Sequence, residues 1–289
     1  MNRPARLPRT DDARAALREV LGARRLPVFP AQHARILECI REDHDNPAPL
    51  VEAISLDPSV SVRVLRLANS AALGLRCRVD SIQRAVVVLG RAQLQSLVVG
   101  LGVVKAIPRH RVGPLDRRRF WATATSRAGI ARRLAEQVMP PAAAVSFTAG
   151  LICDLAVPLM TGARPRLYAD LLRAVRREGM PLDLLEQDSL GWDHADVAGW
   201  LATTWELPAR LSTLLATHHQ PMPEERSEAG IVRAAVIASG STGLEPDAKG
   251  RLARASTACW HHLGIQPDVS RRVLRATVDP KDALSRVFT

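Results

Sequence analysis

The chain has 289 residues, of which 47% are hydrophobic and 24% charged, and its formal net charge is +11. The length allows one large or two modest domains with cores of their own, and the composition is ordinary for a soluble globular protein. The positive charge comes from scattered arginines without a basic tail, and aromatic residues make up only 3% of the chain, which leaves few rings for bases to stack on. We therefore expect solvated helix faces and no specific nucleic-acid site.

Cysteine usage and the N-terminal segment favour a cytoplasmic protein. The four cysteines, at positions 39, 77, 153 and 259, are far apart and form no C-x-x-C pair, which is typical of reduced thiols. Residues 1–12 lack the apolar stretch of a signal peptide. Residues 140–163 have the length of a membrane span, but they contain Pro158 and, near the middle, Asp154, whose charge a membrane would have to bury. We expect a buried core helix there instead.

Helical signals dominate from the N-terminus onward, and strand signals are nearly absent. Asp57 and Pro58 form an N-cap followed by proline in the first turn. Apolar residues then recur with helical spacing at Val60, Val64, Leu67 and Ala71. Ser81 caps the next helical segment, which continues beyond Gly90.

Residues 106–118 interrupt the apolar pattern with two prolines, a glycine and several arginines, which indicates a boundary between subdomains. Further helical segments follow at 120–138, 140–163, 165–178, 194–207, 208–219 and 230–289. The sequence thus predicts an all-α protein with two packed helical lobes. The expected parts are an N-terminal extension (1–18), an N-terminal helical lobe (19–112) and a larger lobe (113–289).

Several segments, in their order, resemble the HDOD domain family of bacterial signalling proteins, which is related to the HD and HD-GYP phosphohydrolases. The most specific is DPSVSVRVLRLANSAALGL, residues 57–75, and residues 26–40, 81–100 and 147–156 add to it. The likeness runs from about residue 19 to 220. It implies that residues 113–289 are built like an HD-type hydrolase core, and that the chain is a non-catalytic regulatory module in bacterial signal transduction.

The resemblance also implies that the metal site of the hydrolases is degenerate in this chain. In those enzymes, histidine and aspartate ligands hold divalent metals that activate water and bind phosphoryl oxygens. The ligand positions correspond here to Thr123, to the pair Cys153 and Asp154, and to Ser239. Three of the four ligands are therefore replaced, and only Asp154 is retained.

Three histidines, His194, His218 and His219, match accessory histidine positions of the extended HD-GYP branch. We interpret them as hydrogen-bonded core histidines, because buried polar groups are normally paired. Asp154, His194 and His218 are weak candidates for metal ligands, and Cys153 beside them would suit zinc, but their spacing is not that of a compact structural site. We therefore expect no metal and no cofactor.

Two polar residues within apolar segments need hydrogen-bond partners. Asp154 is expected to accept hydrogen bonds from Thr123, from another hydroxyl or from a backbone group between helices. Asn69 is expected to fasten a neighbouring turn and not to bind a partner, so that Asp57, Pro58 and Asn69 form a structural signature.

These observations lead to two functional hypotheses. The first is a non-catalytic regulatory module that binds a protein partner or a small effector in a cleft between helices, without a membrane or a specific nucleic acid. The alternative is a metal-dependent phosphohydrolase that acts on nucleotides or cyclic dinucleotides with a divergent site.

The scattered charge predicts only weak binding to nucleic acid, through counterion release. Gel retardation of random DNA and RNA should show complexes that vanish as salt rises to about 0.15 M. A sequence-dependent complex that survives this ionic strength would contradict the prediction.

Overall fold

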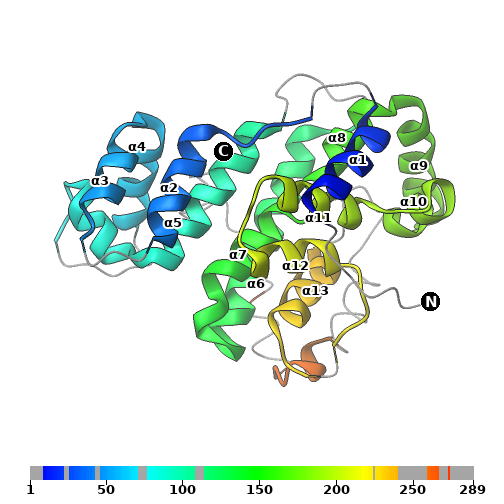
Figure 1. The fold of residues 1–289 in the computed structure, drawn as a ribbon. Coiled ribbons are helices and arrows are strands. Elements are labelled where there is room, and N and C mark those ends of the chain that lie inside the picture. Colours follow the sequence, from blue (N-terminus) through cyan, green and yellow to red (C-terminus); the bar gives the residue numbers. More distant parts are fainter. Residues whose placement is uncertain are drawn as a thin grey trace. The chain divides into compact units, whose positions relative to one another are not determined.

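The structure is a computed structural model that describes residues 9–22, 26–42, 46–70, 77–107, 114–223, 225–239, 259–266 and 273. Every regular element within these residues is a helix, which confirms the all-α prediction (Figure 1). The chain divides into two compact units. The smaller unit contains Val28–Ala106, and the larger unit combines the segment up to Pro27 with Ile107–Val278.

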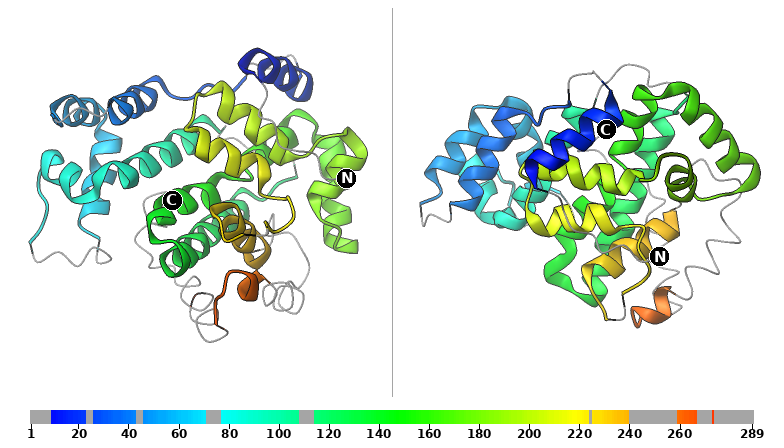
Figure 2. Two further views of the ribbon diagram at one scale, coloured as in Figure 1. Left: turned by 60° about the horizontal axis from the view of Figure 1, so that its bottom comes forward. Right: turned by 45° about the vertical axis from the view of Figure 1, so that its right-hand side comes forward.

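The smaller unit contains α2 (Ala31–Arg41), α3 (Ala48–Ser55), α4 (Pro58–Ala68) and α5 (Ile82–Ala106). The described part of the larger unit contains α1 (Thr10–Leu21), α6 (Arg117–Val138), the short 3-10 helix η2 (Pro140–Ala142), α7 (Ala143–Ile152), α8 (Ala156–Ala163), α9 (Pro165–Glu178), α10 (Leu182–Leu190), α11 (His194–Thr204), α12 (Ala209–Thr217) and α13 (Glu228–Ser239). Helices α11 and α12 lie side by side in both views of Figure 2, where they are yellow-green and yellow.

The observed boundaries differ from the expected division at 1–18, 19–112 and 113–289. Helix α1 belongs to the larger unit, where it packs against α8 and α11 and buries Ala13 and Leu17 completely. Its C-terminal end is also tied down, because Arg164 donates hydrogen bonds to the carbonyls of Glu19 and Val20. The amphipathic face of α1 therefore finds its partner in helices more than 130 residues further along the chain, which the local pattern does not reveal.

Helix α4 begins and ends as its sequence indicates. Asp57 Oδ1 accepts hydrogen bonds from the backbone N–H groups of Ser59 (2.9 Å) and Val60 (3.2 Å), and so caps the helix. Past its last turn, the Asn69 amide donates to the Val79 carbonyl (2.7 Å), and Asn69 Oδ1 accepts from the Val79 N–H (2.8 Å). Asn69 thus fastens the end of α4 to the segment before α5.

The apolar face expected over residues 60–71 is buried where the structure describes it. Val60, Val64 and Leu67 are at most 6% exposed, and Ala71 lies outside the described residues. Helix α5 begins after Ser81 and bends at Gly90, whose φ of 69° favours glycine.

Two helical stretches, Ile82–Ala106 and Pro140–Ala163, are long and apolar enough to qualify as candidate membrane spans by composition. Most of the second stretch is buried inside the larger unit, as expected for a core segment. It is not one continuous helix, however. Helix α7 ends at Ile152 and α8 starts at Ala156, and the turn between them contains Cys153 and Asp154.

We expect Leu67→Ala to lower the free energy of unfolding by about 2–5 kcal/mol, because it leaves a cavity where a 6% exposed side chain packed. Leu56→Ala is the matched control, since Leu56 is 69% exposed and its loss should change stability by no more than about 0.5 kcal/mol. Urea denaturation of both variants measures the difference, and equal midpoints would contradict the packing of α4.

Candidate functional site

Asp154 lies in the turn between α7 and α8 and is 1% exposed, so its carboxylate depends on protein partners. Its Oδ2 is 2.7 Å from Nη1 of Arg127 on α6, and the Arg127 side chain is also 1% exposed. Arg127 Nε donates a hydrogen bond of 2.7 Å to the carbonyl of Gly150 on α7. Asp154 and Arg127 therefore form a buried ion pair, and the guanidinium is also held by the end of α7.

Close packing of α6 on α7 makes this pair possible. A Cβ atom added to Gly150 would lie 3.1 Å from the Ala128 Cα and 3.2 Å from the Arg127 carbonyl oxygen. Glycine at this position thus lets the two backbones approach closely. The guanidinium of Arg127 can then reach both the last turn of α7 and the carboxylate that follows it.

The other oxygen of Asp154 faces imidazole rings. Oδ1 is 3.4 Å from Nε2 of His194, at the start of α11, and 3.3 Å from Nε2 of His218, just after α12. His219 Nε2 lies 2.7 Å from His194 Nε2. One ligand atom from each of Asp154, His194, His218 and His219 lies within 4.8 Å of all the others.

Each ring is held from outside through its Nδ1 atom. His194 Nδ1 is 2.5 Å from Glu186 Oε2, and His218 Nδ1 is 2.7 Å from the Leu215 carbonyl oxygen. His219 Nδ1 lies 3.6 Å from Asp183 Oδ2. The three Nε2 atoms are therefore directed toward a common point, as in metal sites, where outer partners orient the histidine ligands.

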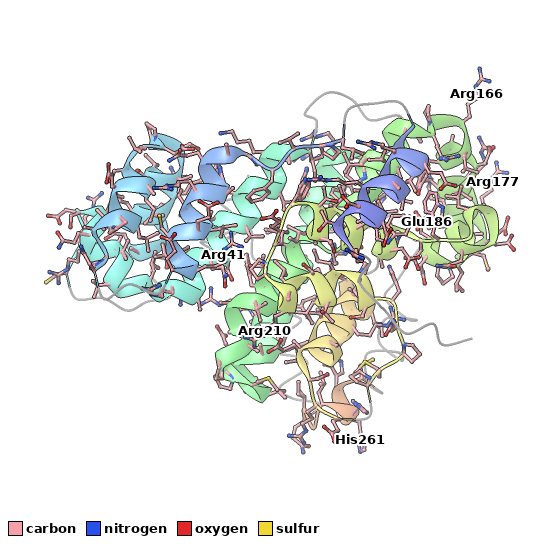
Figure 3. All side chains as sticks on the ribbon, viewed as in Figure 1. Arg41, Arg166, Arg177, Glu186, Arg210 and His261 are labelled. Carbon is pink, nitrogen blue, oxygen red and sulfur yellow. The ribbon has the colours of Figure 1, made fainter. Side chains whose placement is uncertain are left out.

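Glu186 supports His194 from a fully buried position at which it has two further contacts. It accepts hydrogen bonds from the Tyr168 hydroxyl (2.7 Å) and from the His194 backbone N–H (2.9 Å). Figure 3 shows Glu186 within the helices of the larger unit, whereas Arg166 and Arg177 project from its edge. Glu186 is therefore a fixed outer partner of the site.

The charges of this cluster shift several pKa values. Burial alone would raise the pKa of Asp154, but the Arg127 guanidinium and the nearby imidazoles hold it well below its usual range. Burial would lower the pKa of His194, but the carboxylates of Glu186 and Asp154 raise it well above its usual value. Burial and the neighbouring histidines keep the pKa of His219 low. The pKa shifts of Asp154 and His194 thus reflect how closely the two buried carboxylates, Arg127 and the imidazoles are packed together.

The residues present fit one borderline divalent metal ion. His218 Nε2 is buried and makes no hydrogen bond within the part of the chain that the structure describes, so a donor atom is left for a ligand. Tetrahedral zinc with nitrogen ligands at about 2.0–2.1 Å needs ligand atoms about 3.3 Å apart. The two Asp154–imidazole separations already match this, and the His194–His219 pair would have to open by about 0.6 Å from 2.7 Å. Such an ion would supply Lewis acidity at this point.

Of the residues proposed at the degenerate positions, Cys153 is the best defined. Its Sγ lies 3.7 Å from Asp154 Oδ1, and burial raises the pKa of the thiol, so it is a neutral hydrogen-bond donor. Thr123 lies half-buried on α6, one turn before Arg127, and Ser239 Oγ donates to the Val236 carbonyl at the end of α13. None of these three belongs to the group of four ligand atoms, which includes His219 in place of Cys153.

Reasoning from sequence missed the main partner of Asp154. A hydroxyl such as Thr123 was expected, but the partner at 2.7 Å is Arg127. One signal was present, because Arg127 stands four residues after Thr123 on a helix face otherwise made of small apolar residues. The roles of Glu186, Asp183 and Tyr168 depend on contacts over 8 to 36 residues and had no local signal.

We expect Arg127→Met and Asp154→Leu each to destabilise the protein by about 3–5 kcal/mol, because each leaves an uncompensated buried charge. The double variant should lose less than the sum of the two, by about 0.5–3 kcal/mol. Arg132→Met is the control, since Arg132 on the same helix forms its ion pair with the exposed Glu136, one turn away. Chemical denaturation completes the cycle, and strictly additive losses would show that the pair is not coupled.

The geometry agrees with comparisons to known proteins. An uncharacterized protein of Treponema pallidum (strain Nichols) is 25% identical over 206 residues, which cover 69% of this chain and 39% of that protein. The chain therefore matches about two fifths of that relative's length.

Two crystal structures extend the likeness to nearly the whole chain. A "Putative phosphohydrolase" from Shewanella amazonensis SB2B is 27% identical, with a TM-score of 0.69 and coverage of 95% of this chain and 97% of that one. A "Putative signal transduction protein" from Marinobacter aquaeolei VT8 is 20% identical, with a TM-score of 0.69 and coverage of 98% and 67%, and shows the same fold. The HDOD domain pattern itself matches residues 26–221, about two thirds of the sequence, and this chain belongs to the HDOD domain family.

Proposed function

We propose that this protein is a non-hydrolytic signal-transduction module whose HD-related site no longer performs phosphoryl chemistry. The observation that carries the proposal is the buried ion pair between Asp154 and Arg127, at 2.7 Å. Asp154 is the one carboxylate retained from the hydrolase ligand set, and an arginine holds one of its two oxygens.

Hydrolysis by two metal ions needs ligands that hold both ions and a water between them. Here Glu186, the other buried carboxylate beside the histidines, is engaged by His194 and Tyr168. Thr123 and Ser239 offer only hydroxyls, and the Cys153 thiol is neutral. Among the described residues, the three at the degenerate positions therefore supply no anionic ligand for a second metal.

A module without catalytic activity has to act through the molecule that it binds, and we propose a protein partner or a small effector as its ligand. Support comes from membership of the HDOD family and from the likeness to a "Putative signal transduction protein". Binding of such a ligand would change the positions of the helices that converge on the site, which are α6, α7, α11 and α12.

A second candidate is a metal-dependent phosphohydrolase with a divergent site. One observation favours it, namely the convergence of Asp154, His194, His218 and His219 within 4.8 Å. The likeness to a "Putative phosphohydrolase" is consistent with either candidate.

A phosphodiesterase assay separates the two candidates. We expect protein supplied with Mn²⁺, Fe²⁺, Zn²⁺ or Mg²⁺ to hydrolyse neither bis(p-nitrophenyl) phosphate nor cyclic dinucleotides above the rate of the buffer with metal. His218→Ala and the exposed-histidine variant His261→Ala are the paired controls. Turnover that His218→Ala abolishes and His261→Ala preserves would overturn the proposal and establish the hydrolase.

A further inference from the structure

The two oxygens of Asp154 face different kinds of partner. Oδ2 is bound by the Arg127 guanidinium at 2.7 Å, whereas Oδ1 faces Nε2 of His194 at 3.4 Å and of His218 at 3.3 Å. A carboxylate that bridges two metal ions uses one oxygen for each. In this protein one of those two places is taken by a cation that belongs to the chain itself.

We propose that Arg127 replaces one metal ion of a two-ion site, and that Asp154 Oδ1 with His194, His218 and His219 forms a reversible site for a single borderline transition ion such as Zn²⁺. The proposal deepens the proposed function, because it says what the non-hydrolytic site retains. The test of the metal site does not depend on whether the protein hydrolyses phosphate esters.

Charge balance supports one ion and not two. The guanidinium neutralises Asp154 and is also held by its hydrogen bond to the Gly150 carbonyl. A divalent ion on the imidazole side adds charge next to this buried cation. A second ion at Oδ2 would have to displace the buried arginine from its carboxylate partner.

The ligand chemistry selects the class of ion. Three imidazoles and one carboxylate suit Zn²⁺ and similar borderline ions, while Mg²⁺ prefers oxygen ligands and retains several waters. The outer contacts from Glu186, the Leu215 carbonyl and Asp183 hold the three rings with Nε2 inward before any ion arrives.

Because Arg127 already satisfies Asp154, the fold does not depend on the ion. A protein of this kind can be loaded and emptied without unfolding, which makes the ion a candidate input for a signalling module. The site thereby differs from structural zinc sites, in which binding supplies the folding free energy.

The experiment is a titration of tag-free, chelator-stripped protein with Zn²⁺ and Co²⁺, read by elemental analysis after desalting and by the visible absorption of bound Co²⁺. We expect one ion per chain and a tetrahedral Co²⁺ spectrum. Mg²⁺ should not compete. Saturation at two ions per chain would overturn the role of Arg127, and an absence of binding would overturn the metal site while leaving the proposed non-hydrolytic function standing.

Variants locate the ion. His219→Ala removes a ligand that is not a member of the Arg127–Asp154 ion pair, so we expect that pair to remain and the Co²⁺ spectrum to be abolished. Glu186→Gln removes an outer partner and should weaken affinity by about 10–100-fold. His261→Ala, an exposed histidine, should change nothing, and equal loss in this control would show that the binding is nonspecific.

Variants that keep or remove the positive charge at position 127 test whether Arg127 competes with a metal ion. Arg127→Lys keeps a cation near Asp154, whereas Arg127→Met removes it, so the Met variant should bind Zn²⁺ more tightly than the Lys variant by on the order of tenfold or more. Equal affinities in the two variants would show that Arg127 is not a competing cation. If the Met variant does not fold, the stoichiometry of the native protein decides the question by itself.

Discussion

The buried ion pair between Arg127 and Asp154 is the contact on which the site depends. It joins α6 to the turn between α7 and α8, where the packing is so close that a Cβ atom at Gly150 would lie 3.1 Å from the Ala128 Cα. Both side chains are 1% exposed, so neither charge is solvated by water and each depends on the other. The turn that interrupts the long apolar segment is thereby held in one position, and Asp154 Oδ1 is presented to α11 and to the residues that follow α12.

Around that pair, charged and polar side chains follow one another in contact. The His194 ring lies between Asp154 and Glu186, and Tyr168 donates a hydrogen bond to the other oxygen of Glu186. Arg127 and His194 thus lie directly against the two buried carboxylates, so that these polar groups are paired within a core of small and aliphatic side chains. The same arrangement leaves three imidazole nitrogens turned inward.

The smaller unit uses polar groups differently. Asp57 and Asn69 satisfy backbone donors and acceptors at the two ends of α4, and their partners lie within about ten residues along the chain. In the larger unit, by contrast, Asp154 is paired with residues of other helices far along the chain, namely Arg127, His194 and His218. These long-range partners bring the candidate site together at one place.

The sequence by itself determined the helical class, the cap at Asp57, the break near residues 106–118 and the HDOD resemblance, because these depend on local periodicity, capping chemistry and short motifs. It also identified Asp154 as a buried charge in need of a partner. Only the tertiary structure showed that Arg127 is that partner, that His219 joins His194 and His218 in place of Cys153, and that α1 completes the larger unit. The physical reason is that ion pairs and converging ligands are properties of three-dimensional packing, and helices that meet in space can be separated by any length of chain.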